Sequence, residues 1–242
     1  MRVLLYPGCM AALRYPHIEV STKEILGKLG HQVFQLDHII CCGSCILESI
    51  NRMQWLSFAS YILAQAEALR CDLIVTTCGT CTSTISKVRE ALLEDSEDLN
   101  QINAKLSKLN LKLSKPPNVH HITELLHQEL HRLPRPRQNK GTAFIQNACN
   151  LTMTGRLPLS ALAELVEAAG YEVIKHECSN ICCGGSNMVT RREVFDVLAE
   201  KHYKCFGGQN PDIIVVSCST SYMAFVEMGF ADKVKFVSEL FS

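Results

Sequence analysis

Short, mainly apolar runs alternate along the chain with segments in which apolar side chains recur at helical spacing. The longest runs lie at residues 3–6, 73–75, 143–146 and 213–216. Such runs are typical of strands that are buried on both faces. Between residues 159 and 169 the apolar positions are 159, 162, 165 and 166, and Gly170 is a typical helix stop. Strands that alternate with helices predict an α/β fold built from mostly parallel βαβ units.

The second half of this pattern repeats the first at an offset of about 140 residues. Residues 72–78 align with residues 212–218, and Gly30 aligns with Gly170. The cysteines keep the same register: Cys9, Cys41, Cys42 and Cys78 align with Cys149, Cys182, Cys183 and Cys218. The repeat predicts two pseudo-symmetric domains, residues 1–132 and 141–242, joined by a linker at residues 133–140 that is rich in proline and charge.

A last matching pair, residues 119–125 and 234–240, is offset by only 115 residues, so the first copy holds about 25 additional residues. This insert, near residues 93–117, carries apolar side chains at steps of three and four: Leu99, Ile102, Leu106, Leu109 and Leu113. The steps predict a helix with one apolar face. We expect this face to pack against its own domain, and docking to a partner is the alternative.

Charge and hydropathy exclude several classes of function. The 242 residues include 24 Lys and Arg against 24 Asp and Glu, so the net charge is zero. A neutral chain has no global field that attracts nucleic acid or an anionic membrane. We find no secretory signal and no run of 18 apolar residues, and therefore predict a cytoplasmic protein without a membrane span.

Cysteine is the unusual component, with 13 residues in the chain. Most of them follow predicted strands, and the carboxyl ends of parallel strands meet at the edge of the sheet where ligands bind. The first copy offers five thiols, which is more than the four that a structural zinc ion takes. So many soft thiolates favour an iron-sulfur centre. The closely spaced cysteine run of bacterial ferredoxins is absent, so the spacing does not indicate an ordinary cubane cluster.

The first-copy pattern, Cys-x31-Cys-Cys-Gly-x35-Cys-x-x-Cys, resembles the cysteine-rich CCG domain, and two copies in tandem resemble the B subunit of heterodisulfide reductase. This resemblance implies a non-cubane [4Fe-4S] cluster that is the catalytic centre. Its ligands would be Cys9, Cys41, Cys42, Cys78 and Cys81. In the family, two such clusters act together to cleave a disulfide.

The resemblance further implies an oxidoreductase subunit that reacts with a thiol, a disulfide or a carrier-bound sulfur within a complex. Its implied partners are a ferredoxin-like iron-sulfur protein, the C subunit of such complexes, and a flavin-containing A subunit. The alternative is an electron-transfer or quinone-linked subunit of a succinate or fumarate type of complex, with no sulfur substrate. A zinc-stabilised binding module is a third hypothesis.

The second copy departs from the pattern, because Ser221 stands where the repeat expects a fifth cysteine. Four motif cysteines remain, namely Cys149, Cys182, Cys183 and Cys218. Three outcomes are open: a cluster completed by the Ser221 oxygen or left with an open iron, a different four-cysteine cluster, or a zinc site or empty pocket. Cys178, four residues before Cys182, is a candidate replacement ligand.

The other candidates have mainly structural interpretations. Helices are predicted to begin just after Gly43 and Gly184, with their N-termini toward the thiolates. Cys71 and Cys205 are expected to be small buried apolar residues, and Cys45 a structural neighbour of the first cluster. We expect structural roles for His38 and His176, hydrogen bonding to a cluster being the alternative. Arg191 and Arg192 are expected on a solvated face or, alternatively, at an anionic substrate.

Overall fold

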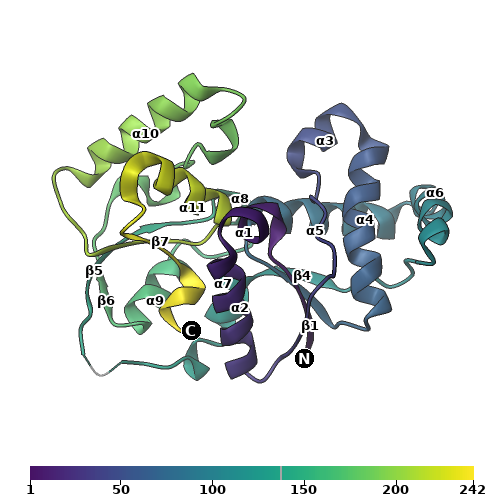
Figure 1. Cartoon of the computed structure of the whole chain (residues 1–242), viewed down its shortest axis with the longest axis horizontal. Helices are drawn as coiled ribbons and strands as arrows, with labels where there is room; N and C mark the ends of the chain where they lie inside the picture. Colours follow the sequence, from purple (N-terminus) through teal and green to yellow (C-terminus); the bar gives the residue numbers. More distant parts are fainter. Residues whose placement is uncertain (137) are drawn as a thin grey trace. The chain divides into compact units, whose positions relative to one another are not determined.

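The computed structural model describes residues 1–136 and 138–242 and, for Cys45, the backbone alone. The chain divides into two compact units, residues 1–19 with 26–121 and residues 20–25 with 122–242. Each unit contains one four-stranded sheet in which every strand pair is parallel (Figure 1). The predicted α/β fold is therefore confirmed. The predicted linker includes Arg137, which lies outside the described residues.

The sheet of the first unit has the strand order β2-β1-β3-β4. Its strands are β1 (Arg2–Tyr6), β2 (Gln32–Phe34), β3 (Leu73–Thr76) and β4 (Asn118–His121). The connecting helices are α1 (Gly8–Arg14), α2 (Pro16–Lys28), α3 (Ser44–Ile50), α4 (Arg52–Ala68), α5 (Gly79–Glu94) and α6 (Ser96–Leu106), followed by the 3₁₀ turn η1 (Ser107–Leu109).

The second sheet repeats this topology with the order β6-β5-β7-β8. Its strands are β5 (Gly141–Gln146), β6 (Tyr171–Val173), β7 (Ile213–Val216) and β8 (Val234–Phe236). Its helices are α7 (Ile122–Gln128), α8 (Cys149–Met153), α9 (Ala161–Ala168), α10 (Arg192–Phe206) and α11 (Ser219–Phe225). Short turns complete it: η2 (Leu130–Arg132), η3 (Glu177–Asn180), η4 (Gly185–Asn187), the π turn η5 (Val226–Phe230) and η6 (Val237–Leu240).

The central strands are buried on both faces, which explains why their sequences do not alternate. Val3, Leu4, Leu5 and Tyr6 of β1 are each at most 1% exposed. Fully burying an aliphatic side chain of this size stabilises the fold by roughly 1.5–3 kcal/mol. The sheets therefore form the core of each unit, and the loops at the strand ends are left to carry chemistry.

The two sheets share an aspartate anchor at the same repeat position. In the first, the backbone N–H of Arg2 donates to Asp72 Oδ2 at 2.7 Å. In the second, the backbone N–H of Thr142 donates to Asp212 Oδ2 at 2.6 Å. Each aspartate precedes the third strand of its unit and binds the first residues of the neighbouring strand, so both sheets start in the same register. The internal repeat thus extends to individual hydrogen bonds.

The insert of the first copy forms α6, as its apolar spacing predicts. Asp95 caps the helix by accepting from the backbone N–H groups of Glu97 and Asp98. Ile102 and Leu106 are buried, and α6 packs against α4 and α5. The expectation that this face packs within its own domain is confirmed for Ile102 and Leu106, but the helix ends at Leu106 and Leu109 is 58% exposed. Among the described residues, none of the helices is at once long and apolar enough to cross a bilayer.

Candidate metal centres

The five cysteines of the first motif lie at the carboxyl ends of three neighbouring strands. Cys9 follows β1 in the first turn of α1, and Cys41 and Cys42 lie in the loop between β2 and α3. Cys78 follows β3 and precedes α5, whose first turn carries Cys81. Parallel topology therefore collects segments that are up to about 70 residues apart in the chain at one edge of the sheet.

The thiols of this motif form a continuous set of contacts. The sulfur atoms of Cys42 and Cys81 are 3.4 Å apart. Side-chain hydrogen bonds also join Cys9 to Cys41, Cys41 to Cys42, and Cys78 to Cys81. Cys42, Cys78 and Cys81 are buried, whereas Cys41 is exposed and Cys9 is half-buried. We call this group the first cysteine cluster; its thiols converge on a site that is open on one side.

The protonation of the first cluster is uneven. Hydrogen bonds from the thiols of Cys42 and Cys9, with one from the backbone N–H of Gly43, lower the pKa of Cys41 to about 2. The hydrogen bond to Cys41 raises the pKa of Cys42 to about 12, and the pKa of Cys9 is raised for the same reason and by burial. One thiolate thus discourages the others from ionising, because like charges repel. Binding of a metal cation would ionise the remaining thiols of the first cluster.

Two glycines shape the backbone around the first cluster. Gly8 has φ +74°, and a Cβ atom built on it would lie 3.0 Å from Cys81 Sγ. Any side chain at position 8 would displace this sulfur, so the position requires glycine. Gly43 has φ +89° and immediately precedes α3 at Ser44. The predicted helix start after Gly43 is therefore confirmed.

The second motif reproduces this arrangement with one atom changed. Cys149 begins α8, Cys182 and Cys183 lie between η3 and η4, and Cys218 precedes α11. The hydroxyl of Ser221 donates to Cys183 Sγ at 3.3 Å. This contact matches the pair of Cys81 and Cys42, with oxygen in place of sulfur. We call Cys149, Cys182, Cys183, Cys218 and Ser221 the second cluster.

Cys182 has the same electrostatic position in the second cluster as Cys41 has in the first. Hydrogen bonds from Cys149 and Cys183 lower its pKa to about 2, and the backbone N–H of Gly184 adds another at 3.4 Å. The pKa values of Cys149 and Cys183 are raised, in both cases first by the hydrogen bond to Cys182 and then by burial. In each vicinal pair, the exposed cysteine is therefore the one whose pKa is lowered.

The prediction of a helix directly after Gly184 is wrong. The chain makes only the 3₁₀ turn η4 there, and α10 begins later, at Arg192. The turn packs against α11, and this contact leaves no room for a side chain at Gly185, where a Cβ atom would lie 2.7 Å from the carbonyl oxygen of Thr220. The segment follows the surface of α11 at this close approach before it turns into a helix.

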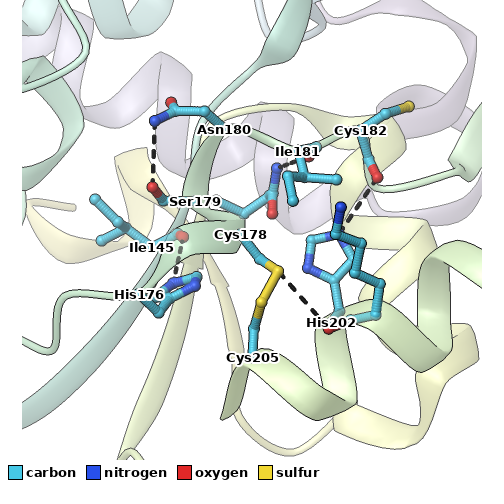
Figure 2. The surroundings of a disulfide bond; sticks show 11 residues. Ile145, His176, Cys178, Ser179, Asn180, Ile181, Cys182, His202 and Cys205 are labelled. Carbon is cyan, nitrogen blue, oxygen red and sulfur yellow. Dashed lines mark hydrogen bonds between the residues drawn. A yellow bond between two sulfur atoms is a disulfide. The ribbon is translucent and has the colours of Figure 1, made fainter.

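The predictions for Cys178 and Cys205 are also wrong. These two residues form a disulfide, with Cα atoms 6.1 Å apart and a sequence separation of 27 (Figure 2). Cys178 is therefore not placed to complete the second cluster, and Cys205 is not a free apolar residue. The bond arises because η3 packs against α10, a tertiary contact that no sequence spacing indicates. Of the side chain of Cys45 the structure describes nothing, so its role stays a prediction.

The remaining candidates take structural positions. Cys71 is free and buried, as predicted. His176 Nε2 lies 3.0 Å from the carbonyl oxygen of Ile145, and burial lowers the pKa of the ring (Figure 2). His38 is exposed. Arg192 forms surface ion pairs with Asp196 and Glu227, which confirms the solvated face, and Arg191 is exposed at the start of the same helix.

Sequence reasoning missed one pair of residues that support the clusters. The hydroxyl of Tyr6 donates to the carbonyl of Ile40 at 2.7 Å. At the equivalent position, Gln146 Nε2 donates to the carbonyl of Ile181 at 2.8 Å. In both units the last residue of the central strand thus holds the residue before the vicinal cysteines. The signal available was a polar group ending each apolar run at the repeat offset.

We expect Tyr6→Phe to weaken this support without changing the shape of the core. The ring stays buried, but the carbonyl of Ile40 loses its donor, which costs about 1–3 kcal/mol. The midpoint of urea unfolding should fall with an unchanged slope, while iron per folded chain stays as in the wild type. Tyr61→Phe, which alters a half-buried tyrosine bonded to Gln65 on α4, is the matched control. Equal losses in both variants would contradict the assignment.

The donor set of the two motifs is consistent with an iron-sulfur centre. Among the described side chains, no group of three or more His, Cys, Asp or Glu is arranged to hold one metal ion. Soft thiolates in larger number are the ligands of iron-sulfur clusters, which spread them over several metal atoms. The cysteine-rich motifs, the contacts among their thiols and the space kept open by Gly8 are consistent with such a group.

Fold and clusters together define a class of protein: a duplicated, cysteine-rich α/β protein with one thiol cluster at the edge of each parallel sheet. A family model described as the CCG cysteine-rich domain matches residues 3–86 and again residues 143–225. The chain belongs to this family and carries two copies of its domain in tandem.

Relatives of known name agree with this assignment. The chain is 26% identical to the B subunit of the ferredoxin/F(420)H(2)-dependent CoB-CoM heterodisulfide reductase of Methanosarcina acetivorans, over 97% of this chain and 83% of that protein. It is 25% identical to a protein of Archaeoglobus profundus named as similar to the heterodisulfide reductase B subunit, over 89% of this chain and 78% of that protein. The resemblance found in the sequence is thus confirmed, and the chain is homologous to an oxidoreductase subunit.

A solved structure shares the fold. A hypothetical protein from Helicobacter pylori superimposes with a TM-score of 0.79 at 16% identity, covering 99% of this chain. The chain spans 48% of that protein. At this identity the likeness supports the architecture of the chain and says nothing of its chemistry.

Proposed function

We propose that this protein is the iron-sulfur subunit of a heterodisulfide reductase-like complex and interconverts a disulfide and its thiols at the first cysteine cluster. The observation that carries the proposal is the convergence of five thiols there, in a chain of contacts that includes the 3.4 Å pair of Cys42 and Cys81. Five thiols exceed the need of a structural zinc ion. Two relatives that match over most of the chain are named as the heterodisulfide reductase B subunit or as similar to it.

The ligands in this proposal are the five thiols of the first cluster, and the group they hold is a non-cubane [4Fe-4S] cluster. When bound, such a group can take the sulfur of a substrate and transfer single electrons to it. The second motif would hold a further iron-sulfur cluster through Cys149, Cys182, Cys183 and Cys218, with Ser221 as the fifth ligand or beside an open iron. A zinc ion is the alternative there.

The surroundings of the first cluster suit a site that must stay anionic and yet accessible. Three of its thiols are buried, while the exposed Cys41 marks the side from which a sulfur compound can approach. The Gly43 N–H and the neighbouring thiols donate to Cys41 Sγ and stabilise its charge. Gly8 keeps a side chain away from Cys81. The polypeptide thus shields three of the sulfur atoms from solvent and leaves the cluster open on the side of Cys41.

Electrons would come from other proteins of the complex in this proposal. The two motifs use nine of the 13 cysteines, and no ferredoxin-like cysteine run is left over for a relay within the chain. We propose that a ferredoxin-like C subunit donates the electrons directly and that a flavin-containing A subunit supplies them to it. The substrate would be a low-molecular-weight or carrier-bound disulfide.

The test begins with metal analysis of anaerobically purified protein. About eight irons and eight sulfides per chain are expected if both motifs hold four-iron clusters, and about four if only the first does. Reduced viologen then serves as an artificial electron donor, with CoB-CoM heterodisulfide and cystine as substrates. We expect oxidation of viologen that depends on disulfide, and thiols in a ratio of two per disulfide. Zinc without iron would overturn the proposal, and iron with no turnover of either disulfide would favour the electron-transfer alternative.

A further inference from the structure

The disulfide of Cys178 and Cys205 lies outside the thiol clusters, and the proposed function makes no use of it. It joins the turn η3 to the C-terminal end of α10 (Figure 2). None of the ten other cysteines whose side chains are described forms a disulfide. A single disulfide in a chain so rich in thiols is exposed to exchange, because thiolates attack disulfides. Its surroundings decide which sulfur is attacked and by what.

The two sulfurs differ in access. Cys178 is completely buried, whereas Cys205 is half-buried and lines an open pocket of about 440 Å³. An incoming thiolate can therefore reach Cys205, and the sulfur of Cys178 is the one that leaves. Cys178 Sγ lies 3.7 Å from the carbonyl oxygen of Lys201, which is placed to accept the S–H of the reduced thiol. Cys178 thus has a polar contact with this carbonyl both in the disulfide and as a reduced thiol.

The pocket is positively charged. Lys175, Lys201 and Lys204 line it, against one carboxylate from Glu177. Lys204 is paired with Glu200 at 2.6 Å, but both side chains are largely exposed, so water screens that pair. His176 also lines the pocket, and burial keeps its ring neutral by lowering its pKa. The positive field of the pocket comes from the lysines and favours a negatively charged ligand.

We propose that the pocket at Cys205 is a thiol-disulfide exchange site for small anionic thiols. The thiolate of the small thiol attacks Cys205 Sγ, and a mixed disulfide forms between the two. Cys178 leaves as a thiolate and takes up a proton. A second molecule of the small thiol then attacks the sulfur of the thiol that is bound to Cys205. This step releases a disulfide made of the two small thiols, and Cys205 leaves as a thiolate and is protonated. In sum, two thiols are oxidised to one disulfide while the protein disulfide is reduced to two thiols.

This site rests on the disulfide and its pocket, and is independent of the iron-sulfur centres. It is close to the second cluster in sequence, since Cys178 precedes Cys182 by four residues. A second tie holds the same segment to α10: His202 Nε2 lies 3.3 Å from the carbonyl oxygen of Cys182 (Figure 2). Opening the disulfide therefore removes the covalent tie of this loop and leaves that polar contact in place.

The test traps the mixed disulfide in the full-length, iron-loaded protein, with oxidised glutathione as the anionic probe. In Cys178→Ser, the remaining Cys205 thiol should form a glutathione adduct, located by peptide mass spectrometry. In the matched variant Cys205→Ser, the buried Cys178 should react at least about tenfold more slowly, since access governs exchange. Equal rates in the two variants, or no adduct at Cys205, would overturn the proposal.

The role of the lysines has its own measurement. In a Cys178→Ser background, Lys175→Gln with Lys204→Gln should slow adduct formation by oxidised glutathione about fivefold at low salt, since two nearby charges are lost. The rate with the neutral bis(2-hydroxyethyl) disulfide should not change. Lys112→Gln, at an exposed lysine of the first unit, is the control. Equal slowing of both probes, or none with glutathione, would refute an anionic specificity. Iron content, measured in parallel, separates this result from any failure of the proposed function.

Discussion

Replacing Cys81 by serine is expected to abolish disulfide turnover and to make the first cluster resemble the second. The new hydroxyl would face Cys42 as Ser221 faces Cys183, at 3.3 Å in the second cluster against 3.4 Å for the native sulfur pair. Serine keeps the size and the hydrogen bond but removes a soft, anionic ligand. Losing even a residue that only orients a metal ligand costs roughly 10–100-fold, so losing a ligand should lower turnover by at least about 100-fold.

Turnover with reduced viologen and electron paramagnetic resonance in the presence of added thiol measure this effect. The signal that responds to thiol should disappear in Cys81→Ser, while the iron of the second motif stays. Cys71→Ser is the matched control, since Cys71 is also a buried free cysteine but lies outside both motifs. A Cys81→Ser protein with wild-type turnover and an unchanged signal would show that the fifth thiol is dispensable.

The converse change, Ser221→Cys, is expected to give the second motif the spectroscopic signature of the first. The added sulfur lies on a rigid position in the first turn of α11, next to Cys183, and completes the five-thiol pattern. If the wild-type protein holds about four irons per chain, the variant should hold about eight, because a full set of thiolates is then present. If the wild type already holds about eight, the iron stays constant and only the signal of the second centre changes.

The added thiol needs a control that introduces cysteine elsewhere. Ser60→Cys places one at a fully buried serine of α4 in the first unit and should change neither iron nor signal. Iron, sulfide and the low-temperature spectrum, measured on the three proteins side by side, decide the result. A second signal that is identical in Ser221→Cys and in the wild type would mean that position 221 does not contact the metal.

Much of the fold follows from local pattern. The uninterrupted apolar runs become the central strands β1, β3, β5 and β7, because a parallel sheet covered on both faces needs no polar side in its strands. The repeat offset places Ser221 opposite Cys81 without any coordinates, since two copies with equal strand and helix lengths keep equal numbering. The insert is likewise recognisable from steps of three and four that suit one helix face.

The sequence pattern does not show which segments far apart in the chain come into contact in the fold. Cys178 and Cys205 have a sequence separation of 27, and no periodicity distinguishes this pair from any other pair of the 13 cysteines. The hydrogen bonds of Tyr6 and Gln146 to the residues before the vicinal cysteines likewise join segments 34 and 35 residues apart. Where a helix was predicted after Gly184, the chain instead makes a turn that packs against α11, which is also a contact between segments far apart in the sequence.

The sequence alone therefore determined the class of fold, the duplication, and the set of thiols at the two strand edges, because strand burial and motif spacing are local properties that survive in a linear pattern. Only the tertiary structure decided which of the leftover cysteines are bonded, which thiol in each vicinal pair is exposed, and which sulfur of the disulfide lines a pocket. Those outcomes depend on burial, hydrogen bonding and distance between segments that meet only when the chain is folded.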